Sequence, residues 1–552
     1  MNRWLLLALG LTMVTPARGR ATTPMSGDWI GGFRSGDGWA SLRFRIDNGA
    51  DSLRGTALLQ HNDVYVDTLV VRGAPGGGRS VRFTATGAVT FDFEGRLGEN
   101  IVRGRVRADG ARKAFELLRM HHVEWTALQR YVGAWRLGPD QVVAFGRHSE
   151  GDGSDPRIRV VNDLGYADSF TGRGGDLIAL SEGEFAFGPA IGVDYPPDVR
   201  VRFSLDPRGE VSGMRWMRGD TSRVATRIPL RAEDVRYSSG DITLAGTVVL
   251  PAGPGPHPAV VLIHGSTPLT RYYFSAAPYL LAAYGVAALC YDKRGCGEST
   301  GRFGWNMPIE TLAADALAGV RLLKGRADVD STQIGVVGHS QGGWVAPAAA
   351  AMSHDVAFVV AGAASGLTTQ DNAANELDGE LKYAGMTDDE RAHARALYQQ
   401  GTRVILSGGE GWNEWRDSTR ACRGQRWFPA YSQRRMGSFM AMNDSTRGRI
   451  LEWIANQRRA MFDPVPVWEK VSVPVLVYEG ELDRSVPAQE SATIIQGALQ
   501  RSGNRDFTVH VFPRASHGLW VVDTGGPKDR LSVSADRRFV RDWILRHVRV
   551  AR

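Results

Sequence analysis

The sequence predicts an all-β region followed by a domain in which helices cover both faces of a mostly parallel sheet. Short runs that alternate apolar and polar residues fill residues 25–231, as in half-buried strands. Continuous runs of Val, Ile, Leu and Ala, separated by helical stretches, fill residues 232–552. Strands that are buried on both faces of a parallel sheet require such runs.

A cleaved export signal is predicted at residues 1–21. Arg3 precedes an apolar run at residues 4–14, and small residues at positions 17, 19 and 21 suit a signal peptidase. The apolar run is shorter than the roughly 20 residues that a spanning helix needs, and no cysteine follows it for lipid attachment. We therefore expect no stable membrane anchor after cleavage, and export to the periplasm or to the medium.

Two internal similarities indicate that the β-rich region consists of two related modules, at residues 25–125 and 126–231. Gly27, Trp29 and Phe33 in the first are echoed by Gly133 and Trp135 in the second. The stretch at 93–107 likewise resembles that at 203–216. A spacing of about 106 residues exceeds any solenoid repeat, so two sandwich or barrel modules fit better than an array.

The next region begins with two antiparallel strands, which we expect within residues 236–253. Buried strands should follow in the runs AVVLIHG, VAALCYD, IGVVGHS, AFVVAGA and VPVLVYEG. A gap of about 105 residues, 368–471, separates the last two, and its helical composition predicts an inserted helical cap rather than a structureless loop. Most of its large apolar side chains should form its own core, with some lining a pocket: Trp412, Trp415, Trp427, Phe428, Met436, Phe439, Met440 and Trp453.

Ser340 in GHSQGG is the candidate nucleophile. The Gly-x-Ser-x-Gly pattern alone is weak evidence, because 66 glycines in 552 residues also produce it around Ser299 in GESTG. Ser340, however, directly follows a predicted buried strand and precedes an alanine-rich helix, an arrangement that lifts a serine above the sheet edge. Ser299 has no such flanks, and we assign it to a structural loop.

A serine hydroxyl needs a base and an anion that orients the base. His517 follows a late strand by a short loop, and Asp483 lies just beyond the strand VLVY. Glu479 and Glu481 are rivals of Asp483. Among the other histidines, His339 should point away from the site and His264 belongs to another loop.

The order Ser340, Asp483, His517, together with four short motifs, resembles the serine α/β-hydrolases. The motifs are HG at His264, DKRGCGES from Asp292, GHSQGG, and GELDRSVP from Gly480. The likeness is nearest to the bacterial carboxylesterase and serine-peptidase branch, with a fainter one to secreted esterases that carry a β-rich amino-terminal region. It implies an α/β-hydrolase fold.

Acyl transfer also needs donors to the oxyanion. The backbone N–H of Gln341, at the amino end of a helix, is one candidate. The resemblance implies the N–H of Ser266 as the second, with Gly265 as the alternative. Arg294 in DKRGCGES is interpreted as a brace for its turn rather than a substrate anchor.

The residues predict an exported serine hydrolase that cleaves small carboxylic esters, and the aromatic and Met content of the insert favours an apolar acyl group. A peptidase or a thioesterase remains the alternative, and a non-catalytic binding protein is a more distant one. A peptidase needs an anion for a free amino terminus, and the insert offers Glu376, Asp378 and Glu380, which suit a helix surface equally well.

Composition excludes several other classes of protein. The net charge of +7 comes from scattered arginines without a basic block, so no nucleic-acid partner is expected. Three cysteines are too few for a disulfide framework, and Cys290 should lie in the core. His121, His122 and Glu124 lack further ligands at a known spacing, so neither a metal nor a cofactor is expected.

Overall fold

The computed structural model describes residues 25–35, 38–48, 52–61, 64–75, 79–108, 110–149, 163–188, 195–433, 447–523 and 530–550. The predicted export signal at residues 1–21 lies outside the described residues. Among the helices of the described part, none is long and apolar enough to cross a membrane. The chain divides into two compact units, Met1–Leu59 with Val66–Arg119, and Gln60–Tyr65 with Met120–Arg552.

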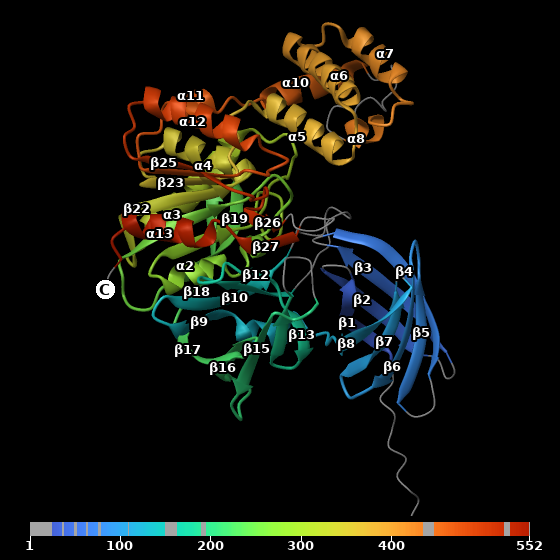
Figure 1. Ribbon diagram of the computed structural model, residues 1–552. Helices are drawn as coiled ribbons and strands as arrows, with labels where there is room; N and C mark the ends of the chain where they lie inside the picture. Colours follow the sequence, from blue (N-terminus) through green and yellow to red (C-terminus); the bar gives the residue numbers. More distant parts are fainter. Residues whose placement is uncertain are drawn as a thin grey trace, which may run out of the picture. The chain divides into compact units, whose positions relative to one another are not determined.

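The first unit is a closed eight-stranded barrel in which neighbouring strands run antiparallel (Figure 1). Its strands are β1 (Gly27–Ser35), β2 (Gly38–Asn48), β3 (Leu53–His61), β4 (Val64–Pro75), β5 (Ser80–Thr86), β6 (Thr90–Leu97), β7 (Ile101–Ala108) and β8 (Ala111–Arg119). Alternate residues of β6 are buried and exposed, as the sequence pattern predicts. The buried residues form a core rich in phenylalanine: Phe33, Phe44, Phe83, Phe91, Phe93 and Phe115.

The second unit begins with the short helices α1 (Trp125–Leu128) and η1 (Gln129–Tyr131), followed by a nine-stranded sheet. Its strands are β9 (Gly133–Gly138), β10 (Gln141–His148), β11 (Asp163–Asp168), β12 (Gly174–Asp176), β13 (Ile178–Ser181), β14 (Glu184–Phe187), β15 (Val199–Leu205), β16 (Val211–Arg218) and β17 (Thr221–Ile228). Its first and last strands, β9 and β17, pair as β1 and β8 do. The sheet has its two edges at β12 and β13, so it is open where the barrel is closed.

The two β-rich regions share a local structure at their first strand. Each begins with a glycine at positive φ, followed two residues later by a buried Trp. An arginine of the last strand pairs with that Trp in register and lies over its ring, at 4.2 Å for Arg119 over Trp29 and 5.7 Å for Arg227 over Trp135. The similar stretches 93–107 and 203–216 form the hairpins β6–β7 and β15–β16, just before the last strand of each region. That the two regions are related modules stays a prediction.

The predicted parallel sheet is confirmed. Its eight strands are ordered β18-β19-β21-β20-β22-β23-β24-β25. They are β18 (Arg231–Ser239), β19 (Ile242–Leu250), β20 (His257–Ile263), β21 (Ala287–Tyr291), β22 (Val329–His339), β23 (Phe358–Gly362), β24 (Val475–Gly480) and β25 (Phe507–Phe512). The pairs β18–β19 and β19–β21 are antiparallel, and the other neighbouring strands are parallel. The parallel strands thus present their carboxyl ends at one edge, where ligands bind in such sheets.

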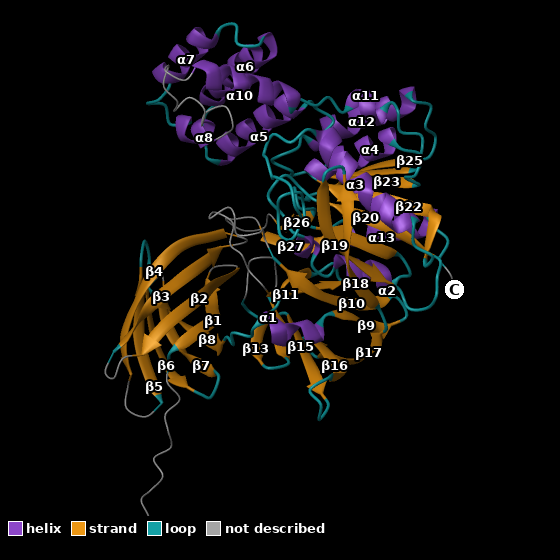
Figure 2. Cartoon of the chain, turned by 180° about the vertical axis from the view of Figure 1, so that it is seen from behind, coloured by secondary structure: helices purple, strands orange, loops and turns teal. Residues whose placement is uncertain are grey.

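Helices cover both faces of this sheet (Figure 2). Alternate strand residues face two separate cores, with Val261 in one and Val260 in the other. The first core contains α3 (Ile309–Lys324), α4 (Gln341–Met352), α11 (Val465–Trp468) and α12 (Ala488–Arg501), and the second contains α13 (Arg537–His547). Trp543 and Ile544 of α13 are buried there, so this is the final packing helix that the sequence predicts. The helix α2 (Ala277–Ala283), preceded by η2 (Arg271–Phe274), also packs against β9 and β10 of the preceding sheet.

The long gap between β23 and β24 contains a helical cap (Figure 1). Its helices are α5 (Thr369–Tyr383), α6 (Asp388–Ser407), α7 (Trp412–Ala421), α8 (Phe428–Gln433) and α10 (Arg447–Arg459). Trp415 and Trp427 are 0% and 1% exposed within its own core. Met436, Phe439 and Met440 lie outside the described residues. A hairpin of β26 (Trp520–Asp523) and β27 (Arg530–Ser534) precedes α13.

Candidate active site

Ser340 lies on a sharp turn between β22 and α4. Its backbone has φ 57° and ψ −119°, a conformation that L-residues rarely adopt and that marks local strain. The turn requires glycine on both sides, since a Cβ on Gly338 would lie 2.0 Å from the carbonyl oxygen of Gly342, and one on Gly342 would lie 2.6 Å from that of Ile263. The flanking glycines therefore allow the turn that raises the Ser340 side chain above the sheet edge.

The structure brings Ser340, His517 and Asp483 together, although they are far apart in the sequence. The Nε2 atom of His517 lies 3.0 Å from the Ser340 hydroxyl, and its Nδ1 atom lies 2.7 Å from Asp483 Oδ2. With Nδ1–H donating to the carboxylate, Nε2 presents a lone pair to the hydroxyl. The geometry therefore suits proton transfer from the serine to the imidazole.

The Asp483 carboxylate is fixed by its own loop. Its side chain is 0% exposed, and Oδ1 accepts hydrogen bonds from the backbone N–H groups of Ser485 and Val486 at 2.7 and 2.9 Å. The rival carboxylates bond elsewhere, because Glu479 accepts from the N–H of Ala364 and Glu481 from that of Arg514. Burial raises the pKa of Glu479 well above its usual value.

Opposing effects set the pKa of His517. Burial lowers it, but the hydrogen bond and charge of Asp483 and the charge of Glu376 outweigh burial, so the pKa lies above its ordinary value. The ring of His339, which we expected to point away, has its centroid 5.3 Å from that of His517. Burial first, and then the charge of His517, lower the pKa of His339 to about 3, so His339 packs there as a neutral ring.

Lys293 joins the two segments from which the oxyanion donors are expected. Its Nζ atom donates to the carbonyl of Gly265 at 2.7 Å and to the side chain of Gln341 at 2.8 Å, and Lys293 is only 5% exposed. We did not identify this residue from the sequence. The available signal was its position two residues after the buried strand β21, at the carboxyl edge of the sheet.

A cavity of about 180 Å³ opens beside Ser340 and His517 and also exposes Ser266 and Gln341. The sheet domain supplies an apolar wall of Trp305, Met307, Ile309, Trp344 and Val486. The cap contributes Tyr398 and Ile405 together with polar side chains, among them Asn372, Glu376 and Gln457. The apolar wall thus comes mainly from the sheet domain, and none of the described aromatic residues of the insert that we expected to line a pocket in part is among the lining residues.

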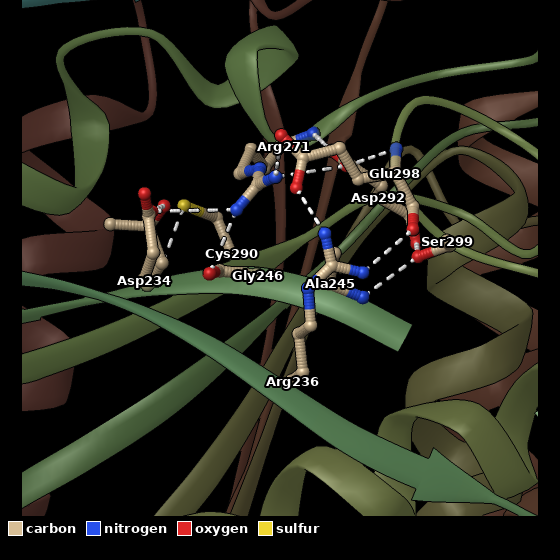
Figure 3. A network of polar contacts seen from close by, with 10 residues as sticks. Asp234, Arg236, Ala245, Gly246, Arg271, Cys290, Asp292, Glu298 and Ser299 are labelled. Atoms are coloured by element: carbon tan, nitrogen blue, oxygen red, sulfur yellow. Dashed lines mark hydrogen bonds and ion pairs between the residues drawn. The ribbon is translucent and has the colours of Figure 1, made fainter. Parts of the chain in front are cut away.

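The loop with the motif DKRGCGES is held in place by ion pairs and hydrogen bonds. Arg271, 3% exposed, forms ion pairs with Asp292 and Glu298 (Figure 3). Ser299 donates to the carbonyl of Asp292 and accepts from the N–H of Ala245, so it is structural. Arg294 forms a two-pronged ion pair with Asp315 of α3 at 2.7 and 2.6 Å, which matches the predicted brace.

The other residues that the sequence analysis considered are buried in the core, exposed at the surface or part of the cap. Burial raises the pKa of the Cys290 thiol to about 12, and burial also lowers that of His264 to about 3. His122 and Glu124 pair with each other at an exposed position, and the described residues contain no group of three or more potential metal ligands. Three carboxylates of the insert were candidates for binding a free amino terminus. Glu376 lines the cavity, Asp378 pairs with Arg391 and Arg395, and Glu380 is exposed.

Comparison with known proteins gives a family match and a curated relative. Residues 260–527 match the model of the Alpha/beta hydrolase family. A segment of 160 residues is 30% identical to Esterase EstD of Thermotoga maritima, covering 27% of this chain and 38% of that relative. The match therefore spans well under half of the relative's length.

Solved structures with similarity include two other hydrolases. Acetyl xylan esterase 1 from Thermoanaerobacterium has 14% identity and a TM-score of 0.36, covering 64% of this chain and 89% of that one. The alpha/beta hydrolase GrgF from Penicillium has 19% identity and a TM-score of 0.36, covering 58% and 99%. From the family match, the parallel sheet and the serine turn, we conclude that the C-terminal part of this chain has the α/β-hydrolase fold.

Proposed function

We propose that this protein is a serine hydrolase that cleaves carboxylic esters through an acyl-enzyme. The observation that carries the proposal is the position of His517, within hydrogen-bond distance of both the Ser340 hydroxyl and the Asp483 carboxylate. A general base must reach the proton that it removes and must be held in the correct tautomer. One imidazole, that of His517, meets both requirements.

The reaction proceeds in two halves. His517 removes the hydroxyl proton as Ser340 attacks the ester carbonyl, and the imidazolium then gives that proton to the departing alcohol. The acyl group remains on Ser340 until His517 removes a proton from water and the water attacks the acyl carbon. The bond to Ser340 then breaks, the imidazolium returns the proton to the Ser340 oxygen, and the acid is released. Asp483 orients the imidazole and stabilises its positive charge in each half.

The oxyanion is assigned to the backbone N–H groups of Gln341 and Ser266. Gln341 is the first residue of α4, where N–H groups have no intrahelical acceptor and the helix dipole favours negative charge. Lys293 supports Ser266 over Gly265, because it binds the Gly265 carbonyl. In a planar trans peptide the C=O and the following N–H point in opposite directions, so the Ser266 N–H faces away from the ammonium.

Replacing Lys293 with methionine is therefore expected to lower kcat by about 10- to 100-fold, with a smaller change in KM, because an oxyanion donor loses its orientation. Steady-state kinetics on the folded variant measures this effect. Lys324→Met, at an exposed ion pair with Asp355, is the matched control and should retain full activity. An unchanged kcat in the folded Lys293→Met enzyme would contradict a role of Lys293 in orienting the oxyanion donor.

The pH dependence follows from the raised pKa of His517. Because the base acts only when neutral, kcat/KM should fall as the pH drops below that pKa, and this fall should begin above the range of an ordinary histidine. Removing the charge of Glu376 with Glu376→Gln lowers the pKa, so the acid limb should move to lower pH. A profile of kcat/KM against pH for an uncharged ester measures the shift. An acid limb that moves to higher pH in Glu376→Gln would contradict the prediction.

The ester preference is tested with short p-nitrophenyl esters and thioesters against aminoacyl p-nitroanilides. The apolar wall at Trp305, Met307 and Trp344 supports an apolar portion in the substrate, and the small cavity supports a short one. We expect the esters to have the higher kcat/KM. Rapid turnover of the anilides alone would make the protein a peptidase, and preference for the thioesters would make it a thioesterase.

The export signal predicted at residues 1–21 is the basis for placing this activity in the periplasm or outside the cell. We propose that the mature protein acts there on small-molecule esters without a membrane anchor. Fractionation of cells that express the full chain tests this, with the mature amino terminus determined by mass spectrometry. Retention of residues 1–21 on a cytoplasmic protein would contradict the proposal.

A further inference from the structure

One wall of the active-site cavity is rich in hydrogen-bond acceptors. Asn372 and Glu376 lie one turn apart on α5, and both line the cavity together with Ser340 and His517. The Asn372 amide nitrogen donates to Glu376 Oε1 at 3.3 Å, which aligns the amide with the carboxylate. Asn372 is 6% exposed, and its Oδ1 atom has no hydrogen-bond partner in the structure.

A buried acceptor without a donor has a cost in free energy that a bound ligand removes. Among the described residues that line the cavity, Glu376 is the one carboxylate, and no lysine or arginine is present. A carboxylate in a small, partly apolar cavity favours a cation. The wall thus offers a negative charge and an unused oxygen acceptor side by side.

Resting on the proposed ester hydrolysis, we propose that the substrate carries a protonated amine on a short acyl chain, bound by Glu376 and Asn372. The ammonium donates to the Glu376 carboxylate and to Asn372 Oδ1, while the methylene groups lie against the apolar wall. The ester carbonyl then reaches Ser340, which lines the same cavity. This assignment narrows the predicted acyl group from simply apolar to short and amine-bearing.

The test compares two esters of equal size. The p-nitrophenyl ester of β-alanine ends in an ammonium group, and p-nitrophenyl butanoate ends in a methyl group at the same position. We expect Glu376→Gln to lower kcat/KM for the β-alanine ester by about 10- to 100-fold, as for loss of a charge-assisted hydrogen bond. The butanoate value, measured on the plateau of its pH profile, should change by less than about threefold. Comparing variants on each ester cancels the intrinsic reactivity of that ester.

Two further variants complete the design. Asn372→Leu removes the unused acceptor and should also reduce the β-alanine value more than the butanoate value. Glu380→Gln changes an exposed carboxylate on the same helix and should alter neither ester. Equal losses on both esters in Glu376→Gln would overturn the inference, because the residue would then act only through His517.

The failure of this inference is distinguishable from failure of the proposed function. A fluorophosphonate reagent labels a reactive serine without using the amine-binding wall. If the folded wild type is labelled at Ser340 but shows no selective loss in Glu376→Gln, only the amine assignment is wrong. If the folded wild type is not labelled, the serine hydrolase itself is wrong.

Discussion

Replacing Ser340 with alanine is expected to reduce kcat for any ester substrate by about a million-fold. The hydroxyl is the atom that forms the acyl-enzyme, and its neighbour His517 cannot activate a methyl group. The variant should still hydrolyse the ester about 10³- to 10⁴-fold faster than the uncatalysed reaction in water, because oxyanion stabilisation and substrate binding remain. Steady-state hydrolysis of p-nitrophenyl butanoate by purified protein measures both values.

Ser299 provides the matched control for this substitution, because it has the same flanking glycines. Its hydroxyl only ties the DKRGCGES loop to the neighbouring strand. Ser299→Ala should therefore lose about 1 kcal/mol of stability and keep kcat per folded molecule. Full activity in Ser340→Ala, with loss in Ser299→Ala, would reverse the assignment of the nucleophile.

The second large effect is expected at Asp483. Asp483→Asn should lower kcat by about 10⁴-fold, because an amide that donates to Nδ1 favours the wrong tautomer of His517. The change is isosteric, and the backbone donors of Ser485 and Val486 still find an oxygen. Kinetics and thermal unfolding of the same preparation separate the catalytic loss from misfolding.

Glu479→Gln is the control for Asp483, since Glu479 lies four residues earlier and is 0% exposed. Its raised pKa means that the carboxyl is held uncharged by burial, so a neutral glutamine preserves its environment. We expect kcat to change by less than about threefold, because Glu479 bonds to Ala364 rather than to His517. Loss of activity in Glu479→Gln but not in Asp483→Asn would make Glu479 the orienting carboxylate.

The strands of the parallel sheet were predictable because their signal is local. Runs such as AVVLIHG and IGVVGHS contain residues for both faces, and the structure places Val260 and Val261 in opposite cores. The serine turn was also predictable, because the close approach of Gly338 and Gly342 is possible only without side chains. In each case a few neighbouring residues determine the outcome.

Lys293 could not be identified as a site residue in this way, and Glu376 could not be distinguished from Asp378 and Glu380. A lysine after a buried strand usually reaches solvent, and only the fold brings the Gly265 carbonyl within 2.7 Å of this one. Glu376 has the spacing of an ordinary surface helix, and its face depends on how the cap packs over the sheet edge. Contacts between segments that are distant from each other in the sequence leave no local pattern.

In the β-rich regions, too, the sequence predicts local structure but not the contacts between distant segments. Alternating residues predict strands, but barrel closure depends on the pairing of β1 with β8, which alternation does not encode. The Gly-x-Trp similarity was visible, whereas its partners Arg119 and Arg227 became visible only through register.

Covalent labelling tests the central claim most directly, namely that His517 and Asp483 make the Ser340 hydroxyl reactive. The purified full chain, Ser340→Ala and His517→Ala are treated with a fluorophosphonate, and the adduct is located by peptide mass spectrometry. We predict a single rapid adduct on Ser340 in the wild type, none at that position in Ser340→Ala, and labelling slower by orders of magnitude in His517→Ala. A folded wild type that does not react, or that reacts at Ser340 equally fast without His517, would contradict the account.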